Sequence, residues 1–223
     1  MESTSRLLER DRIWDAARRV EGDLLREGFS ELGARAQGMF QEKGVRNILV
    51  LGCGRENDAM LFSKRGFCVL TVDLSSVGLG RAEGMTESRA PVRCGALLAQ
   101  NIRDRIPEPS SSVDAIYSVL FLCMDLQEEE IKDVMRECLD VLRPGGLMVL
   151  SVHSDRDPDC GKATKCGVDE WKVDRGFVVH FFSEDRIKKV ARGFEILWVR
   201  EYKEAEPLSR VMYEVVLMRP KGL

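Results

Sequence analysis

The sequence predicts an α/β fold, a doubly wound and mostly parallel sheet that ends in an antiparallel hairpin. Two observations support this prediction. Apolar segments of strand length alternate with amphipathic segments of helix length between residues 45 and 152, and these strand segments are apolar on both flanks, as buried parallel strands require. The last two strand segments are joined only by a short loop through Pro207, which indicates a hairpin.

Seven strands and five helical regions can be placed on the chain. The expected strands are residues 47–51, 68–72, a short one ending near 101, 113–119, 147–152, 194–202 and 210–218. The expected helices are 5–43 in two pieces that break near Gly28, 58–65, one starting near 76, 128–142 and 183–191. Residues 143–146, Arg-Pro-Gly-Gly, are expected to stop a helix before the fifth strand. The polar, glycine-bearing residues 155–176 are expected to form a long loop over one end of the sheet.

Length and composition favour one folding unit, with a helical cap at residues 1–44 and a sheet domain at residues 45–223. The formal charge of −3 gives no basic face for nucleic acid. The apolar run at 115–124 is about half of the roughly 20 residues that a membrane-spanning helix needs. Seven cysteines without a Cys-x-x-Cys pair or a secretion signal indicate free thiols in a reducing compartment, so we expect a cytoplasmic protein without a metal site. The sequence does not indicate an oligomeric state.

A glycine turn follows the first strand and predicts a cofactor that carries a nucleoside. A strand that ends on Gly52-Cys53-Gly54 brings bare backbone up to a ligand, and Asp73, after the second strand, can accept hydrogen bonds from a ribose diol. The dinucleotide fingerprint needs a third glycine, where this chain has Asn57. An NAD(P)-dependent oxidoreductase is therefore the less favoured alternative.

Four segments in this order resemble the class I S-adenosylmethionine-dependent methyltransferases: residues 50–54, 72–75, 114–118 and 141–147. Of these, Leu-Arg-Pro-Gly-Gly between a long helix and a strand is the most specific. The resemblance implies a Rossmann-like fold, S-adenosylmethionine as cofactor, S-adenosylhomocysteine as product and a small-molecule acceptor. Residues 117–124, 161–162 and 178–183 are similar to the tellurite-resistance and thiol-type group, which implies a thiol or metalloid acceptor.

The resemblance also implies which residues contact the cofactor, all of them at or just after the ends of the first four strands. They are Gly52, Cys53, Gly54, Glu56, Asp73, Leu74, Asn101, Ile102, Ser118, Val119 and Leu120. Asn101 and Ile102 would meet the adenine, and residues 118–120 would line the cofactor near its sulfonium.

Five further residues are candidates for the reaction itself. His153 and His180 could each act as a general base because histidine titrates near neutrality, with a hydrogen-bonded structural role as the alternative. Trp14, Tyr117 and Cys123 are candidate substrate contacts, with a place in the core as the alternative for Trp14 and Cys123.

Two departures from the family pattern keep a second function open. Val50 stands where the family often has an acid, and Glu56 replaces its third glycine. They favour the alternative of a catalytically degenerate binding or scaffold protein with the methyltransferase fold.

Overall fold

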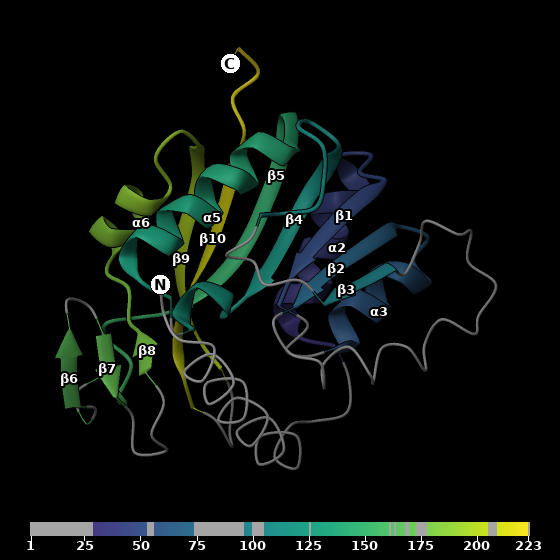
Figure 1. The fold of residues 1–223 in the computed structure, drawn as a ribbon. Coiled ribbons are helices and arrows are strands. Elements are labelled where there is room, and N and C mark those ends of the chain that lie inside the picture. Colours follow the sequence, from purple (N-terminus) through teal and green to yellow (C-terminus); the bar gives the residue numbers. More distant parts are fainter. Residues whose placement is uncertain are drawn as a thin grey trace.

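A seven-stranded sheet forms the centre of the protein in the computed structural model, which describes residues 29–52, 56–73, 96–99, 105–124, 126–160, 162, 164–167, 170–172, 178–204 and 209–222 (Figure 1). Its strands are β1 (Asn47–Leu51), β2 (Cys68–Asp73), β3 (Ala96–Ala99), β4 (Val113–Val119), β5 (Leu142–His153), β9 (Glu195–Lys203) and β10 (Val211–Met218). The order is β3-β2-β1-β4-β5-β10-β9. Neighbours from β3 to β5 are parallel, whereas β10 is antiparallel to both β5 and β9. The predicted fold class is confirmed, including the terminal hairpin.

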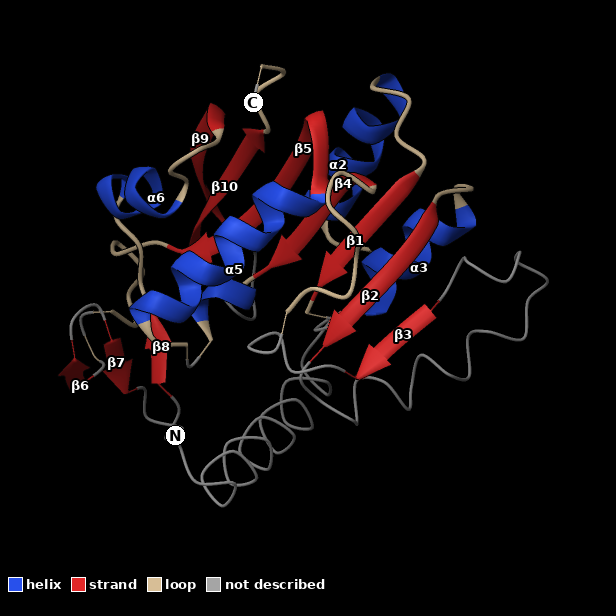
Figure 2. Cartoon of the chain, turned by 45° about the horizontal axis from the view of Figure 1, so that its top comes forward, coloured by secondary structure: helices blue, strands red, loops and turns tan. Residues whose placement is uncertain are grey.

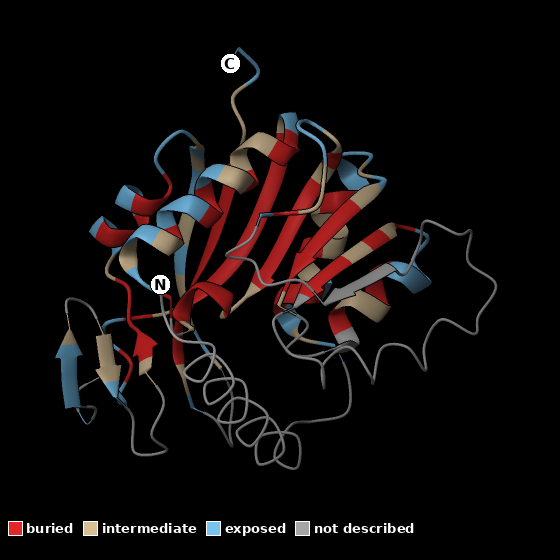
Figure 3. Cartoon of the chain, viewed as in Figure 1, coloured by how far each residue is buried: buried red, intermediate tan, exposed pale blue. Residues whose placement is uncertain are grey.

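Helices cover both faces of this sheet (Figure 2). They are α2 (Glu31–Glu42) and α3 (Glu56–Lys64) on one face, and α5 (Glu128–Val141) and α6 (Glu184–Val190) on the other. Because side chains alternate along a strand, β1 sends Ile48 and Val50 into the core under α2 and α3, and Leu49 and Leu51 into the core under α5 and α6. The central strands are therefore buried on both sides, as Figure 3 shows.

Local sequence signals set the helix ends. The Ser30 hydroxyl accepts a hydrogen bond from the backbone N–H of Gly33 at 2.8 Å and starts α2. The backbone N–H of Gln127 donates to the Glu130 carboxylate at 2.7 Å and starts α5. Gly66, at φ +89°, makes the turn after α3.

The prediction that residues 143–146 precede the fifth strand is wrong, because β5 already begins at Leu142. Leu142 pairs with Val113 of β4. The backbone N–H of Gly145 donates to the carbonyl of Arg219 at 2.8 Å, and the N–H of Arg219 donates to the carbonyl of Gly146 at 3.0 Å. The glycine-rich segment is thus held by main-chain hydrogen bonds, which sequence periodicity does not report.

The predicted long loop at residues 155–176 is also wrong in part. Strands β6 (Thr164–Gly167), β7 (Glu170–Lys172) and β8 (Val178–His180) form a second, antiparallel sheet. These strands have three or four residues each and no apolar alternation, so hydrophobic periodicity does not predict them. The small sheet follows the end of β5, where Ser154 bridges to Phe182 just after β8.

The predicted cap is described only from residue 29 onward. Within it, α2 buries Leu32, Ala36 and Phe40 in the same core cluster as Phe62 of α3. The helix expected before Gly28 and the helix expected near residue 76 lie outside the described residues, so the cap and the division at residue 44 stay predictions. No helix in the described ranges is long and apolar enough to cross a membrane.

Candidate cofactor and acceptor site

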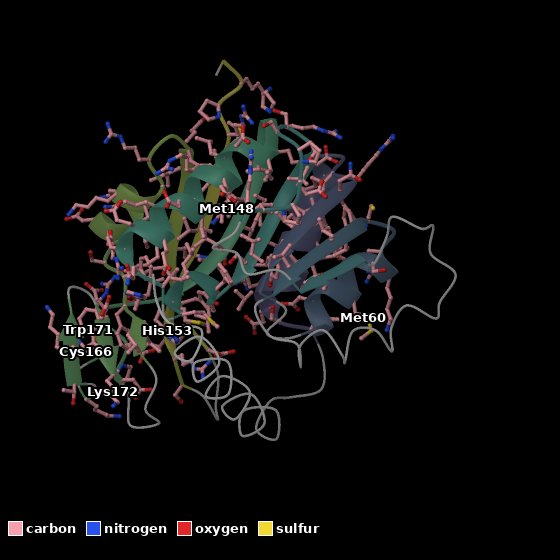
Figure 4. The ribbon with its side chains drawn as sticks, in the orientation of Figure 1. Met60, Met148, His153, Cys166, Trp171 and Lys172 are labelled. Atoms are coloured by element: carbon pink, nitrogen blue, oxygen red, sulfur yellow. The ribbon has the colours of Figure 1, made fainter. Side chains whose placement is uncertain are left out.

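The parallel strands bring most of the described candidate residues to one edge of the sheet. In the register of β1, Leu51 lies beside Val72 of β2 and Ser118 of β4. Gly52, the end of β2 and the end of β4 therefore meet at the same carboxyl edge. The next strand, β5, ends there on His153 (Figure 4). Open α/β sheets bind their ligands at this edge.

Gly52 occupies a backbone conformation and a space that require glycine. Its φ is +78°, and an added Cβ would lie 3.0 Å from Cδ2 of Phe121. Its backbone N–H donates to the carbonyl of Val72 at 2.9 Å, which fixes the start of the turn against β2. Cys53 and Gly54 lie outside the described residues, and Glu56, whose side chain is not described, begins α3.

The end of β4 leaves a buried polar atom without a partner. Ser118 is 1% exposed, and its hydroxyl oxygen makes no hydrogen bond with the described residues. Leu120, at φ +54°, turns the chain into the short helix η1 (Phe121–Cys123), and its N–H donates to the carbonyl of Ser151 at 3.0 Å. Val119 pairs with Ser151 in the same ladder.

The turn at Gly52 and the Ser118 hydroxyl together suit a ligand that brings polar groups close to the protein backbone. An unsatisfied buried hydroxyl costs about 1–3 kcal/mol, which a hydrogen bond from such a ligand would recover. Asp73 ends β2 at this edge, although its side chain is not described. Leu74, Asn101 and Ile102 lie outside the described residues.

His153 and Cys123 meet at the end of β5, and both are uncharged. The backbone N–H of His153 donates to the Cys123 sulfur at 3.0 Å. Burial, together with the positive charge of Arg210, lowers the pKa of His153 to about 3. Burial raises the pKa of the Cys123 thiol to about 12. At neutral pH the imidazole is therefore a weak, neutral base, and the thiol keeps its proton.

The small sheet adds an aromatic wall beside His153. The His153 ring lies 5.6 Å from the ring of Phe181, which lies 5.4 Å from the ring of Trp171. Figure 4 shows Trp171 and Lys172 of β7 to one side of His153. The nearest carboxylate to the His153 Nδ1 among the described contacts is Asp157, at 4.0 Å. Sequence reasoning missed this wall and Asp157, because residues 155–176 carry no pattern that places them at the site.

His180 has the contacts of a structural histidine. It is 1% exposed; its Nε2 lies 2.6 Å from the carbonyl oxygen of Leu126, and its Nδ1 lies 3.2 Å from Nη2 of Arg186. Arg186 in turn donates to the Glu128 carboxylate at 2.8 Å. With both ring nitrogens in these contacts, the ring links β8 to the start of α5 and α6.

Tyr117 lies on the α2 face of β4, in the same core cluster as Phe62 of α3. It is 2% exposed, and its hydroxyl donates to the Asp58 carboxylate at 2.7 Å. Sequence reasoning did not single out Asp58, although a carboxylate in the first turn of a helix after a glycine turn is visible in the sequence. Trp14 lies outside the described residues. Across the residues that the structure describes, no three His, Cys, Asp or Glu side chains gather where they could hold a metal ion.

Comparison with known proteins supports a methyltransferase domain. Residues 48–146 match the family model described as a methyltransferase domain. A curated candidate methyltransferase of Geobacillus sp. (strain WCH70) is 29% identical over 119 residues, which are 52% of this chain and 45% of that protein. The chain thus matches less than half the length of this relative.

Two solved structures share the fold at low sequence identity. An S-adenosylmethionine-dependent methyltransferase from Clostridium acetobutylicum ATCC 824 superposes with a TM-score of 0.67 and 15% identity over 93% of this chain and 99% of its own. The 1,6-didemethyltoxoflavin-N1-methyltransferase of Burkholderia thailandensis, solved with bound 1,6-didemethyltoxoflavin and S-adenosylhomocysteine, gives a TM-score of 0.66 and 14% identity over 97% of this chain and 88% of its own. The matched domain, the strand order and these superpositions identify the chain as a protein with the Rossmann-like fold of the S-adenosylmethionine-dependent methyltransferases.

Proposed function

We propose that this protein transfers a methyl group from S-adenosylmethionine to a small-molecule acceptor with a soft nucleophile, a thiol or a metalloid. The observation that carries the proposal is the glycine turn at Gly52, which lies at the carboxyl edge of a sheet whose residues 48–146 match a methyltransferase domain. S-Adenosylhomocysteine is the second product.

The cofactor would lie across the ends of β1, β2 and β4. Gly52, Cys53 and Gly54 would admit its methionine part close to the backbone, and the Asp73 carboxylate would accept hydrogen bonds from the ribose hydroxyls. Asn101 and Ile102 would meet the adenine. The proposed lining also includes Glu56, Leu74, Ser118, Val119 and Leu120.

The electrostatics of the edge favour a soft acceptor. The pKa of His153 lies near 3 and that of Cys123 near 12, so neither group is a strong base at neutral pH. An oxygen or nitrogen acceptor would need such a base, whereas a thiol of ordinary pKa, about 8.5, is partly ionised already. The positive charge of Arg210 helps to lower the pKa of His153 and partly opposes the effect of burial on Cys123, and it would also favour an anionic acceptor.

The reaction then requires mainly alignment. The thiolate sulfur attacks the methyl carbon, a new sulfur–carbon bond forms, and the carbon–sulfonium bond breaks with its electron pair remaining on the cofactor sulfur. Holding the three atoms in line can supply about 7–11 kcal/mol of the barrier. His153 is proposed to line the acceptor site, with Trp171 on the wall beside it.

Calorimetric titration with S-adenosylmethionine and S-adenosylhomocysteine tests the cofactor. We expect micromolar binding, about −8 kcal/mol, that fails in Asp73→Ala, with NADH as the negative control. If the folded protein bound neither adenosyl compound, Val50 and Glu56 would mark a lost site and the enzyme proposal would be wrong.

The acceptor class is tested by turnover and by His153→Gln. Thiols and metalloid oxyanions are compared with catechol and amine acceptors, and methylation only of the latter would contradict the soft-acceptor proposal. Because a soft nucleophile needs no base, we expect His153→Gln to change kcat by no more than about threefold. A loss of about 100-fold would instead make His153 a general base.

A further inference from the structure

We propose that Asp58 is a positioning residue that fixes the start of α3 against β1 and β4, on either side of the glycine turn, and so supports cofactor binding. The inference rests on the proposed function, since it concerns the same turn, but it assigns a role to a buried network between α2, α3 and β4. That network joins three parts of the chain: the start of α2, the first turn of α3 and β4.

Asp58 is a buried carboxylate with three hydrogen bonds. It is 3% exposed. Its Oδ1 accepts from the backbone N–H of Ser30 at 2.8 Å, and its Oδ2 accepts from the Ser30 hydroxyl at 2.6 Å and from the Tyr117 hydroxyl at 2.7 Å. All three donors are uncharged, so hydrogen bonds alone compensate for the lost hydration of this carboxylate.

Residues around the Asp58 carboxylate leave space for it and hold it by hydrogen bonds. An added Cβ at Gly33 would lie 2.5 Å from Oδ1 of Asp58, so only a glycine lets α2 approach this closely. The Ser30 hydroxyl donates to Asp58 and accepts from the N–H of Gly33, and it therefore starts α2 and binds α3 at once. Burial, and next the charge of Asp58, raise the pKa of Tyr117, which keeps its hydroxyl a donor.

The link from this network to the turn is a matter of chain connectivity. Gly52 directly follows β1, which ends at Leu51, and Asp58 lies in the first turn of α3, which begins at Glu56. Only residues 53–55 connect the two. Tyr117 pairs in register with Val50, two residues before Gly52. The hydrogen bond from Tyr117 to Asp58 therefore connects α3, which follows the turn, to β4, which lies beside β1, the strand that precedes the turn. It fixes the distance that residues 53–55 must span.

A purely structural role would make a different prediction. In that case, substitution of Asp58 would lower the free energy of unfolding and leave the folded protein's affinity for the cofactor unchanged. If Asp58 has a positioning role, its substitution lowers that affinity in protein that is still folded, because the start of α3 is held less firmly against β1 and β4.

The test compares Asp58→Asn and Tyr117→Phe with Val216→Ala, a matched control. Val216 is fully buried in the same core cluster, but it lies on β10. Thermal unfolding measures stability, and titration with S-adenosylhomocysteine well below each melting temperature measures affinity. We expect Asp58→Asn to raise the Kd at least about tenfold and Tyr117→Phe to raise it about three- to tenfold, with Val216→Ala staying within about twofold at a comparable loss of stability.

Amide hydrogen exchange across residues 52–57 without ligand gives a second readout that does not depend on the cofactor. Faster exchange there in Asp58→Asn or Tyr117→Phe, but not in Val216→Ala, supports the positioning role even if the native protein binds no adenosyl compound. Such a lack of binding would overturn only the proposed function. Unchanged affinity and unchanged exchange in the Asp58 and Tyr117 variants would overturn the positioning role. If Asp58→Asn does not fold, Tyr117→Phe, which keeps the ring, decides the question.

Discussion

Glu214→Gln should destabilise the protein at neutral pH and much less at acid pH. Glu214 lies on β10 and is 1% exposed. Its Oε2 accepts from Nε and Nη2 of Arg35, at 3.1 and 2.7 Å, and from Nη2 of Arg200, at 2.8 Å. The carboxylate thus joins α2 to the hairpin, and glutamine keeps its shape without its charge.

The expected cost follows from these contacts. Hydrogen bonds to a charged group contribute about 1.5–3 kcal/mol each against about 1 kcal/mol for neutral ones. The side chains of Arg35 and Arg200 are 34% and 55% exposed, so water replaces part of what they lose. We therefore expect a loss of about 2 kcal/mol in the free energy of unfolding, or about 4–8 °C in Tm.

The pH dependence has a definite sign. Burial opposes the charge on Glu214, but the hydrogen bonds and charges of Arg200 and Arg35 outweigh it, so its pKa lies below the ordinary 4.5. A lowered pKa gives stability that is present above the unfolded-state pKa and is lost as the pH falls through the folded-state pKa. The difference between the native protein and Glu214→Gln should be full above about pH 5 and shrink below about pH 4.

Chemical denaturation of both proteins from pH 3.5 to 7 measures this difference. Glu129→Gln is the control, because Glu129 pairs with Lys132 in an exposed i,i+3 ion pair, and we expect it to cost no more than about 0.5 kcal/mol. A difference for Glu214→Gln that does not vary with pH, or that is no larger than the control's, would refute the reasoning.

Two further substitutions test the site and its support. Gly52→Ala should lower the free energy of unfolding by about 1–2 kcal/mol because of the positive φ alone, and by more because of contact with Phe121. It should also weaken S-adenosylhomocysteine binding at least about tenfold by calorimetry. An affinity equal to the native protein's would contradict the role of the turn. His180→Phe should lower the free energy of unfolding by about 1–3 kcal/mol, since it removes the contacts with Leu126 and Arg186, yet should leave kcat within about threefold. A selective loss of kcat in a stable His180→Phe protein would favour the general-base alternative.

Much of the fold could be predicted from local patterns in the sequence. The strand at 113–119 has the predicted bounds because most of its residues are apolar and a turn precedes it. The helix that starts at Glu128 is marked by its acidic first turn and by Ile131, Val134, Met135 and Cys138, which lie at helical spacing and are buried. The hairpin of β9 and β10 followed from the short connection between two apolar segments.

Other features depended on partners distant in the sequence. The sequence at Gly145 and Gly146 is typical of a turn, yet both residues belong to β5 and form main-chain hydrogen bonds with Arg219. The small sheet has too few residues per strand to show a period, and it is placed by the contact of Trp171 with Phe181.

The sequence by itself determined the fold class and the glycine turn, because hydrophobic period and the conformational freedom of Gly52 are local properties. Only the tertiary structure decided which polar groups are buried and with what partners. It placed both ring nitrogens of His180 in polar contacts, left His153 neutral at the end of β5, and paired the Tyr117 hydroxyl with the Asp58 carboxylate. These outcomes depend on desolvation and on atoms brought together from distant parts of the chain, and no spacing within one segment encodes them.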